Sequence, residues 1–442
     1  MSAVEVFKIL LGNIQKAQLP LILLRPREIS ENISYTGDYD FFIPPMYNNE
    51  LLKIVLDTAI STNSSFTVTR AKHGKIDVTL LNSIDNKSIA LEIWNILSVK
   101  DPEKKTLRYI YPQILAKYIQ NNSEGKLSLS LDIEALYYLS HLFTGKKKLS
   151  TPLVKERLLY YLTSLKNSNS KYHMLFNDLL QNKLEIKEVA HKANMILVDK
   201  GLLALKNNLK ANIVEISTKI SSNWIRIKRK LFSLIRLIPI IGPDGVGKTT
   251  LIEAVQKSTQ KEIGVFKFKK TFRVSPIYKI LFPLFRYMFK KELNVKKQIG
   301  KSEVDDRYGN FVIFNALLMY PLRLIKNLFS RKFVFIDRYF HEHLMINARN
   351  KAKKSALRND WKFWLAFIPR TYIIIQLDAP TEVIIKRKNE LDEDSIEAYR
   401  TYLFQTFLEK PFIVYCYINT DLPAEQCSNL LLKICKNKIK CT

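Results

Sequence analysis

The first hundred residues alternate short apolar runs with turn residues, a pattern typical of strands that pack against a core. The runs are Leu19 to Leu24, Phe41 to Ile43, Ile76 to Leu81 and Ile89 to Ile93. Because each run is too short for a buried helix, the pattern predicts a small mixed α/β domain over residues 1–125.

Apolar residues change their spacing in the middle of the chain. From Asp132 to about Leu234, Leu, Tyr and Ala recur at helical intervals. Ser150-Thr151-Pro152 supplies an N-cap and a first-turn proline for a helix from Leu153 to Leu165. We therefore predict a helical region over residues 126–231.

The last part of the chain alternates strands with helices. Apolar runs lie at Leu237–Ile241, Phe333–Ile336, Tyr372–Leu377 and Phe412–Ile418. That order is typical of a parallel sheet with helices on both faces. The predicted fold class is therefore α/β, with a parallel-sheet domain over residues 232–442.

A glycine-rich loop, Gly242-Pro-Asp-Gly-Val-Gly-Lys-Thr-Thr250, follows the first of these strands and fills every position of the pattern G-x-x-x-x-G-K-[ST]. Gly242, Gly245 and Gly247 let the backbone approach phosphates, so that its N–H groups and the next helix bind the anion. Lys248 then reaches the β and γ oxygens, the Thr249 hydroxyl holds Mg²⁺, and Thr250 completes the set. The loop predicts a nucleoside triphosphate site.

Charged side chains follow the later strands. Asp337 and Arg338 end one strand, at the edge where open α/β sheets bind ligands. The helices beyond the next strand carry cations that can close over a transferred phosphate: Lys386, Arg387, Lys388 and Arg400. The alternative is ordinary ion pairing, locally between Asp337 and Arg338 or between Arg387 and Glu390 on one helix.

Two of these motifs, Gly242–Thr250 and Asp337-Arg338-Tyr339, resemble those of the thymidylate kinase family. The chain looks more closely like the thymidylate kinase-like proteins of bacterial surface-polysaccharide gene clusters, which share a segment such as Leu377–Glu382 followed by Arg387–Glu390. The resemblance covers about residues 232–440. It implies a P-loop nucleoside-monophosphate-kinase-like fold and an ATP-dependent phosphotransferase that uses ATP and Mg²⁺ on a small-molecule phosphate acceptor, such as a nucleotide or sugar phosphate.

The resemblance also implies roles for single residues. Lys248 and Thr249 serve ATP and Mg²⁺, Arg338 positions the acceptor phosphate, Arg387 belongs to the lid, and Asp244 contacts an acceptor hydroxyl. Asp337 is a further candidate for the metal or, after Asp244, for the base. The basic, aromatic stretch from Phe266 to Lys297 stands where thymidylate kinases carry their base-reading residues. Thymidylate is therefore not the acceptor that we expect.

Two carboxylates, Asp38 and Asp40, alternate where an N-terminal strand begins, so both side chains point to one face and can bind two divalent metals. This resembles the Asp-x-Asp of the nucleotidyltransferase superfamily, with Asp77 as third carboxylate and Glu92 in reserve. The glycine turn that grips triphosphate in that superfamily is replaced by Leu23–Arg27, where Arg25 is a substitute phosphate ligand. Either the domain binds metal with weak or no nucleotidyl transfer, or it is a binding module only.

The net charge of +29, from 70 Lys and Arg against 41 Asp and Glu, suits phosphate-bearing ligands, nucleic acid or an anionic membrane surface, although compositional bias explains it equally well. Residues 225–237 mix cations with Leu and Phe, which is typical of a helix on a membrane surface or of a linker helix packed on its own domain. We favour the linker. An ATP-switched protein that uses its basic surface on nucleic acid or membrane is the alternative to the kinase.

All four cysteines lie at or after Cys416 without a C-x-x-C spacing, so neither a disulfide framework nor a zinc site is predicted. Residues 1–19 lack the pattern of a secretory signal, and the longest apolar run, at 311–322, is broken by Asn315 and Pro321. We therefore expect a cytoplasmic protein.

Overall fold

The computed structural model of the chain describes residues 1–24, 38–72, 74–81, 88–103, 107–110, 112–121, 127–143, 149–203, 237–259, 264–267, 334–340, 366–368, 371–388, 392–409 and 414–440, with short pieces between 216 and 320. Most of the basic stretch from Phe266 to Lys297, and Arg25, lie outside these residues.

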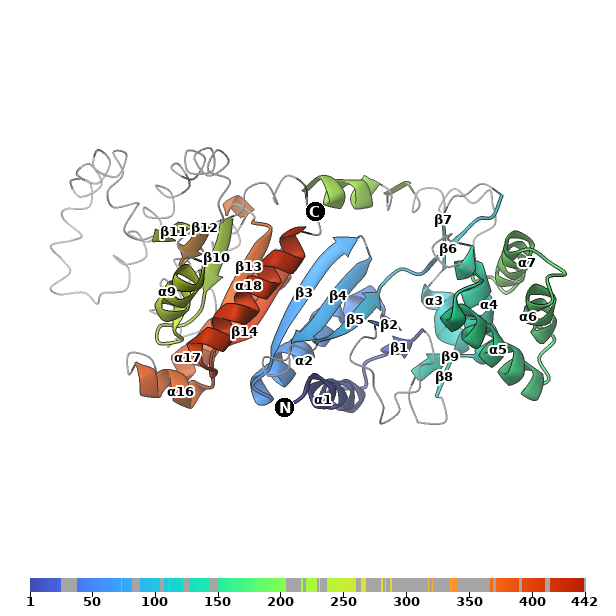
Figure 1. The fold of residues 1–442 in the computed structure, drawn as a ribbon, viewed down its shortest axis with the longest axis horizontal. Coiled ribbons are helices and arrows are strands. Elements are labelled where there is room, and N and C mark those ends of the chain that lie inside the picture. Colours follow the sequence, from blue (N-terminus) through green and yellow to red (C-terminus); the bar gives the residue numbers. More distant parts are fainter. Residues whose placement is uncertain are drawn as a thin grey trace.

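Twelve of the described strands form one sheet that runs through most of the molecule (Figure 1). In spatial order they are β11 (Gly264–Lys267), β12 (Val334–Asp337), β10 (Leu237–Ile241), β13 (Ile373–Asp378), β14 (Val414–Asn419), β3 (Ser65–Lys72), β4 (Lys75–Leu81), β5 (Ser88–Trp94), β2 (Asp38–Phe42), β1 (Ile22–Leu23), β9 (Leu127–Leu129) and β8 (Ile119–Asn121). A separate hairpin pairs β6 (Ser98–Lys100) with β7 (Leu107–Tyr109). The chain is therefore a mixed α/β protein.

The five strands from β11 to β14 in this order are parallel. Every residue of β10, β13 and β14 is buried, because helices cover both faces of this part of the sheet. The apolar runs expected at 237–241, 333–336, 372–377 and 412–418 become β10, β12, β13 and β14. Parallel pairing brings their carboxyl ends to one edge.

The sheet continues from the C-terminal part of the chain into the N-terminal part. β14 pairs antiparallel with β3, in a register that places Tyr417 opposite Phe66. The two rings stack with their centroids 5.3 Å apart. β3 is not among the predicted runs, because its apolar residues Phe66 and Val68 alternate with threonines. The two parts therefore share one sheet.

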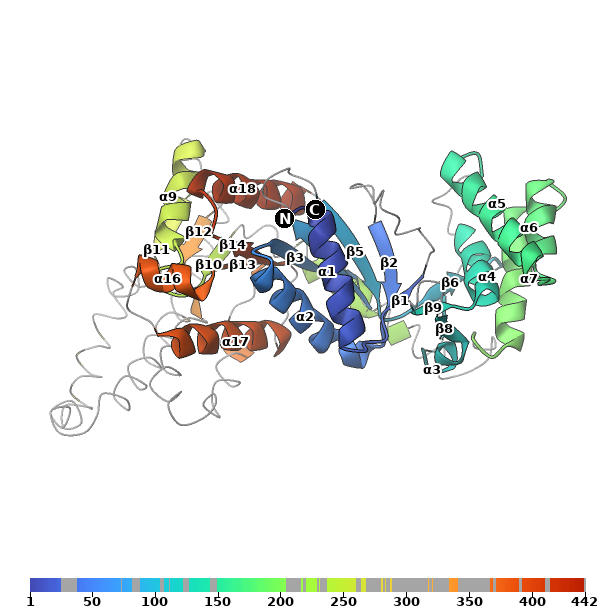
Figure 2. The ribbon, with the colours of Figure 1, turned by 90° about the horizontal axis from the view of Figure 1, so that it is seen from below.

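Two helical layers cover this sheet (Figure 2). On one face, α9 (Lys248–Ser258), α16 (Thr381–Arg387) and α18 (Ala424–Lys440) pack on β10, β13 and β14. On the other face, α1 (Ala3–Lys16), α2 (Asn48–Ser61) and α17 (Glu393–Glu409) share one core. In that core Phe407 of α17 stacks on Tyr415 at 4.1 Å, and Phe7 of α1 packs on Tyr39 at 4.8 Å. Both halves of the chain thus contribute to a single hydrophobic core.

A second core belongs to the helical region, which lies at the far end of the sheet (Figure 1). Its helices are α4 (Leu131–Leu142), α5 (Pro152–Asn167), α6 (His173–Leu180) and α7 (Ile186–Asp199). The short elements that complete the described fold are η1 (Pro45–Tyr47), α3 (Pro112–Leu115) and η2 (Ala116–Tyr118). The predicted helix from Leu153 to Leu165 lies within α5, where Thr151 takes the N-cap position but its side chain caps no backbone group.

Candidate active site

The glycine-rich loop joins β10 to α9. Gly245 and Gly247 adopt φ angles of 94° and 92°, which side chains other than hydrogen strongly disfavour. A Cβ atom on Gly242 would lie 2.4 Å from the backbone oxygen of Leu377. Gly242 therefore lets the loop pass close to β13, and the other two glycines allow its turn.

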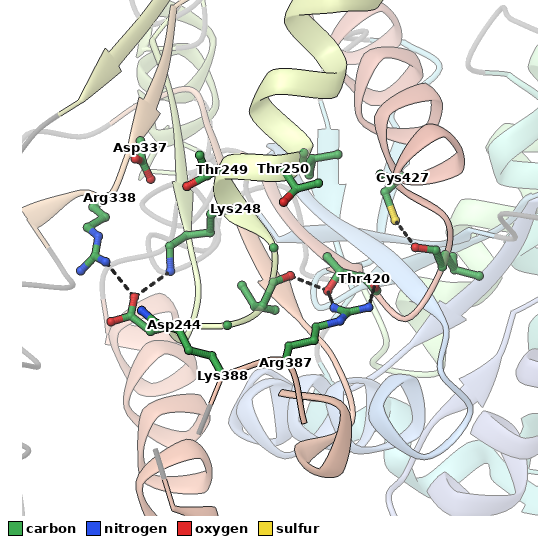
Figure 3. Close-up of a pocket in the computed structure, with 16 residues that line it drawn as sticks. Asp244, Lys248, Thr249, Thr250, Asp337, Arg338, Arg387, Lys388, Thr420 and Cys427 are labelled. Carbon is green, nitrogen blue, oxygen red and sulfur yellow. Dashed lines mark hydrogen bonds and ion pairs between the residues drawn. The ribbon is translucent and has the colours of Figure 1, made fainter. Parts of the chain in front are cut away.

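A cavity of about 540 Å³ opens over this loop (Figure 3). Four parts of the chain complete its wall: the end of β12, the end of α16, the segment after β14 and the start of α18. Its lining includes the predicted Asp244, Gly245, Gly247, Lys248, Thr249, Thr250, Asp337, Arg338 and Arg387. The structure thus brings these predicted residues together, whereas Gly242, Lys386 and Arg400, which were also predicted, do not line the cavity.

Lys248 is buried, with 7% of its surface exposed. Its ammonium donates hydrogen bonds to the backbone oxygens of Gly242 and, at 3.0 Å, Pro243. The same ammonium lies 3.6 Å from Oδ1 of Asp244. These acceptors belong to the loop itself, so the lysine is held with its charge at the floor of the cavity.

Arg338 reaches the loop from the end of β12. Its Nη2 donates to Oδ1 of Asp244 at 2.8 Å, so Asp244 contacts two cations (Figure 3). Arg338 adopts a φ of 69°, a left-handed conformation that costs an arginine on the order of 1 kcal/mol or more. Its backbone N–H donates to the oxygen of Ile240 at 3.2 Å. This turn directs the guanidinium toward the glycine-rich loop.

Arg387 ends α16 and lies against the segment after β14. Its Nη2 donates to the backbone oxygen of Thr420 at 3.0 Å, and its Nη1 lies 3.4 Å from the Thr420 hydroxyl. That hydroxyl is 2.8 Å from the backbone oxygen of Val246 and 3.0 Å from that of Asp378. Thr420 therefore links the arginine, β13 and the glycine-rich loop.

Thr420 and Tyr399 are site residues that the sequence analysis missed. The hydroxyl of Tyr399, on α17, donates to the backbone oxygen of Gly242 at 2.9 Å and so supports the start of the loop from below. Thr420 directly follows the run that becomes β14, so the rule that ligands bind at the carboxyl ends of parallel strands was a usable signal for it. No sequence pattern marks Tyr399.

Arg400 does not line the cavity, so the prediction that it closes over a phosphate is wrong. It is buried, and its Nε lies 2.7 Å from Oδ2 of Asp378. The hydroxyl of Tyr417 donates to the same oxygen at 3.0 Å. Burial raises the pKa of Asp378, although the hydrogen bond and charge of Arg400 oppose the shift. The pair anchors α17 to the end of β13.

The N-terminal carboxylates lie on neighbouring strands. Asp40 is opposite Glu92, and Glu92 is opposite Asp77, so all three point to one face of the sheet. Asp38 also belongs to β2, but its side chain is not among the described ones. Nε1 of Trp94 donates to Asp40 at 3.3 Å.

Lys75 occupies the space between two of these carboxylates. Its ammonium is 2.9 Å from Oδ1 of Asp77 and 2.8 Å from Oε1 of Glu92. Burial lowers the pKa of Lys75, but hydrogen bonds and charge from Glu92 and Asp77 outweigh it and raise the pKa overall. Among the described residues, no group of three or more His, Cys, Asp or Glu side chains is placed to hold a metal ion. The side chain of Asp38 is not among the described ones, so the metal site at Asp38, Asp40 and Asp77 stays a prediction, and the described cation beside Asp77 is Lys75.

No protein-family profile and no curated protein matches the sequence. Among solved structures, the chain is similar to thymidylate kinase from Ehrlichia chaffeensis, with 14% sequence identity and a TM-score of 0.28. The likeness covers 45% of this chain and 96% of the kinase.

Proposed function

We propose that the chain is an ATP-dependent phosphotransferase whose acceptor is a small phosphorylated or hydroxylated metabolite, such as a nucleotide or a sugar phosphate. One observation carries the proposal. The cavity over the glycine-rich loop gathers a buried lysine, two arginines and two carboxylates from separate strands and helices. Such a set positions phosphates and stabilises their negative charge.

The donors on the loop side of the cavity fit ATP and Mg²⁺. The first turn of α9 begins at Lys248, and N–H groups of a first turn have no carbonyl partner within their helix. The Thr249 hydroxyl and the Asp337 carboxylate supply oxygen, the ligand type that Mg²⁺ takes. When bound, Mg²⁺ neutralises charge on the phosphate oxygens. Leu422, Ala424 and Cys427 give the cavity apolar lining suited to a nucleobase.

The acceptor belongs, in this proposal, on the side of Arg338 and Asp244. A guanidinium at this position binds an acceptor phosphate, and an acceptor of that kind needs no general base. With a hydroxyl acceptor, Asp244 is the carboxylate placed to accept the proton. Lys248, Arg338 and Arg387 stabilise the charge that develops on the transferred group.

The test is a screen of the purified full-length protein for ATP-dependent phosphorylation of nucleoside monophosphates and sugar phosphates. Lys248→Ala should reduce turnover on the active substrate at least about a hundredfold, because the loss of one such contact costs roughly 3 kcal/mol. Lys257→Ala is the matched control, since Lys257 is an exposed lysine in the last turn of the same helix. Wild-type turnover in the Lys248→Ala protein would refute this role for the loop.

A further inference from the structure

A short helix with an unusual surface lies between the helical region and β10. Residues 220–228 are helical and form the yellow-green helix along the upper edge of the molecule in Figure 1. Four large apolar side chains of this segment are exposed: Ile216 by 57%, Ile220 by 64%, Trp224 by 54% and Ile227 by 48%. Of these four, Ile227 falls within residues 225–237, where the linker interpretation expects apolar side chains to pack on the protein.

The exposed apolar side chains share one face. Ile220, Trp224 and Ile227 are spaced i, i+4 and i+7, which places them in one line along a helix. Ser221, Ser222 and Ile225, which lie away from this line, are only half-exposed. The helix therefore presents a continuous apolar stripe outward.

Cations flank this stripe. Arg226 and Lys230 are exposed, and the Lys228 ammonium lies 4.9 Å from the centre of the Trp224 ring. By helical spacing, Arg226 and Lys230 fall on one side of the stripe and Lys228 on the other. The sequence from 216 to 243 contains no Asp or Glu. Among the described residues from 220 to 230, the exposed side chains are therefore apolar or positive, apart from the neutral Asn223.

We propose that this helix docks the protein onto an anionic lipid surface. An apolar stripe with Trp, flanked by Lys and Arg, suits the boundary between acyl chains and headgroups: the ring and the isoleucines enter the boundary while the cations meet the phosphates. The proposed association is peripheral, through this helix. None of the described helices is long and apolar enough to cross a bilayer. The net charge of +29 adds long-range attraction to the same surface.

The composition of the stripe distinguishes this partner from others. Nucleic acid is held mainly by cations on phosphates and gains little from a row of isoleucines. A protein partner with an apolar groove would have to carry acidic rims on both sides. An anionic bilayer combines an apolar interior with negatively charged headgroups, and these match the apolar stripe and the cations of the helix.

The test is co-sedimentation of the full-length protein with vesicles of phosphatidylcholine alone and with roughly a third phosphatidylglycerol, at low and high salt. We expect binding only to the anionic vesicles and release by salt. Ile220→Ser with Trp224→Ser should weaken binding at least about tenfold, because the apolar contact is lost. Arg226→Glu with Lys230→Glu should do the same, since each cation near the surface contributes a factor of about five.

Matched controls make the same kinds of substitution, two apolar side chains to serine or two cations to glutamate, elsewhere on the surface. Leu159→Ser with Met174→Ser removes two equally exposed apolar side chains from α5 and α6, and Lys187→Glu with Lys192→Glu reverses two exposed lysines on α7. Both controls should bind as the wild type does. Because all the substituted side chains are exposed, thermal midpoints should stay unchanged.

Three results would overturn the proposal. The first is that the wild-type protein does not bind anionic vesicles. The second is an Ile220→Ser, Trp224→Ser protein that binds them normally, which would reduce the effect to charge alone. The third is equal loss of single-stranded DNA binding in that protein, which would favour nucleic acid. An emission shift on vesicles that disappears in Trp224→Phe would locate the contact at this residue.

Discussion

The Thr420 hydroxyl lies 2.8 Å from the backbone oxygen of Val246, and this contact joins the segment after β14 to the glycine-rich loop. The preceding residue reaches the N-terminal part of the chain: the Asn419 N–H donates to the Ser65 hydroxyl at 3.0 Å. A path of hydrogen bonds therefore runs from β3 to the loop. The N-terminal part of the chain thus supports the site as well as the sheet.

Thr420→Val tests this support, because valine has the same shape and lacks the hydroxyl. The Val246 oxygen loses a donor and Arg387 loses one of its two contacts, so we expect ATP·Mg²⁺ to bind about tenfold more weakly, or ~1.4 kcal/mol. Titration calorimetry measures this. Thr420→Ser retains the hydroxyl and should bind nearly as the wild type does. Equal weakening in both variants would indicate a loss of packing instead.

Arg338→Ala separates acceptor from ATP binding. In the proposed function the guanidinium contacts the acceptor phosphate, and a hydrogen bond to a charged group contributes about 1.5–3 kcal/mol. We therefore expect the acceptor KM to rise at least about tenfold while ATP affinity changes little. Arg338→Lys keeps the charge and should recover part of the loss. Calorimetry in which ATP affinity falls as much as acceptor affinity would contradict the assignment.

The glycine-rich loop and the strands around it could be predicted because their signals are local. G-x-x-x-x-G-K-[ST] fixes the spacing of the phosphate-binding groups within eight positions of the chain, Gly242 to Thr249. Asp337 and Arg338 follow an apolar run directly, and parallel pairing then places them beside the loop. Where a residue and its partner are close in sequence, or are aligned by sheet topology, the sequence pattern is sufficient to predict that they meet.

The junction of β14 with β3 could not be predicted in this way. It pairs residues such as Tyr417 and Phe66 that are far apart in the chain, and its register depends on side-chain packing in the shared core. Arg400 illustrates the same limit, because its position on a helix does not reveal that Asp378 is its partner. Lys75 is a third case: it is close to Asp77 in sequence, but its pairing with Glu92 depends on strand register.

Glu134 predicts a pH dependence of stability that is independent of the proposed activity. It is buried in the helical region, where burial raises its pKa to about 8 against a hydrogen bond from Tyr161 that lowers it. The unfolded chain releases this proton near pH 4.5, the ordinary value. Between these values the folded state holds more protons, so the stability of the wild type should fall as pH rises from about 4.5 to 8.

Glu134→Gln mimics the protonated side chain and should remove this dependence. We expect the variant to gain stability relative to the wild type as pH rises, reaching a difference on the order of a few kcal/mol at pH 8. Urea unfolding across the pH range measures it. Glu156→Gln makes the same change at an exposed position on α5 and should parallel the wild type. Parallel curves for Glu134→Gln and the wild type would refute the raised pKa.

The final prediction concerns Lys75, whose ammonium stands between Asp77 and Glu92. Lys75→Met leaves two carboxylates directly opposite each other on adjacent strands, an arrangement that destabilises a sheet. Both are partly exposed, by 25% and 28%, so solvent screens part of the repulsion. We expect a loss of about 1–2 kcal/mol in the free energy of unfolding. Lys8→Met, an exposed lysine on α1, should have almost no effect.

Adding a divalent metal distinguishes a cluster neutralised by Lys75 from the metal site expected at Asp38, Asp40 and Asp77. If the lysine is the cation of the cluster, Mn²⁺ should leave the thermal midpoint of the wild type unchanged and raise that of Lys75→Met, because a cation then has carboxylates to bind and stabilises the folded state by mass action. Thermal unfolding of the full-length protein with and without Mn²⁺ measures both. A midpoint that Mn²⁺ raises equally in the wild type would show that metal binds beside Lys75. The double variant Asp38→Asn, Asp40→Asn would then locate that metal, since the effect of Mn²⁺ on the midpoint should vanish in it.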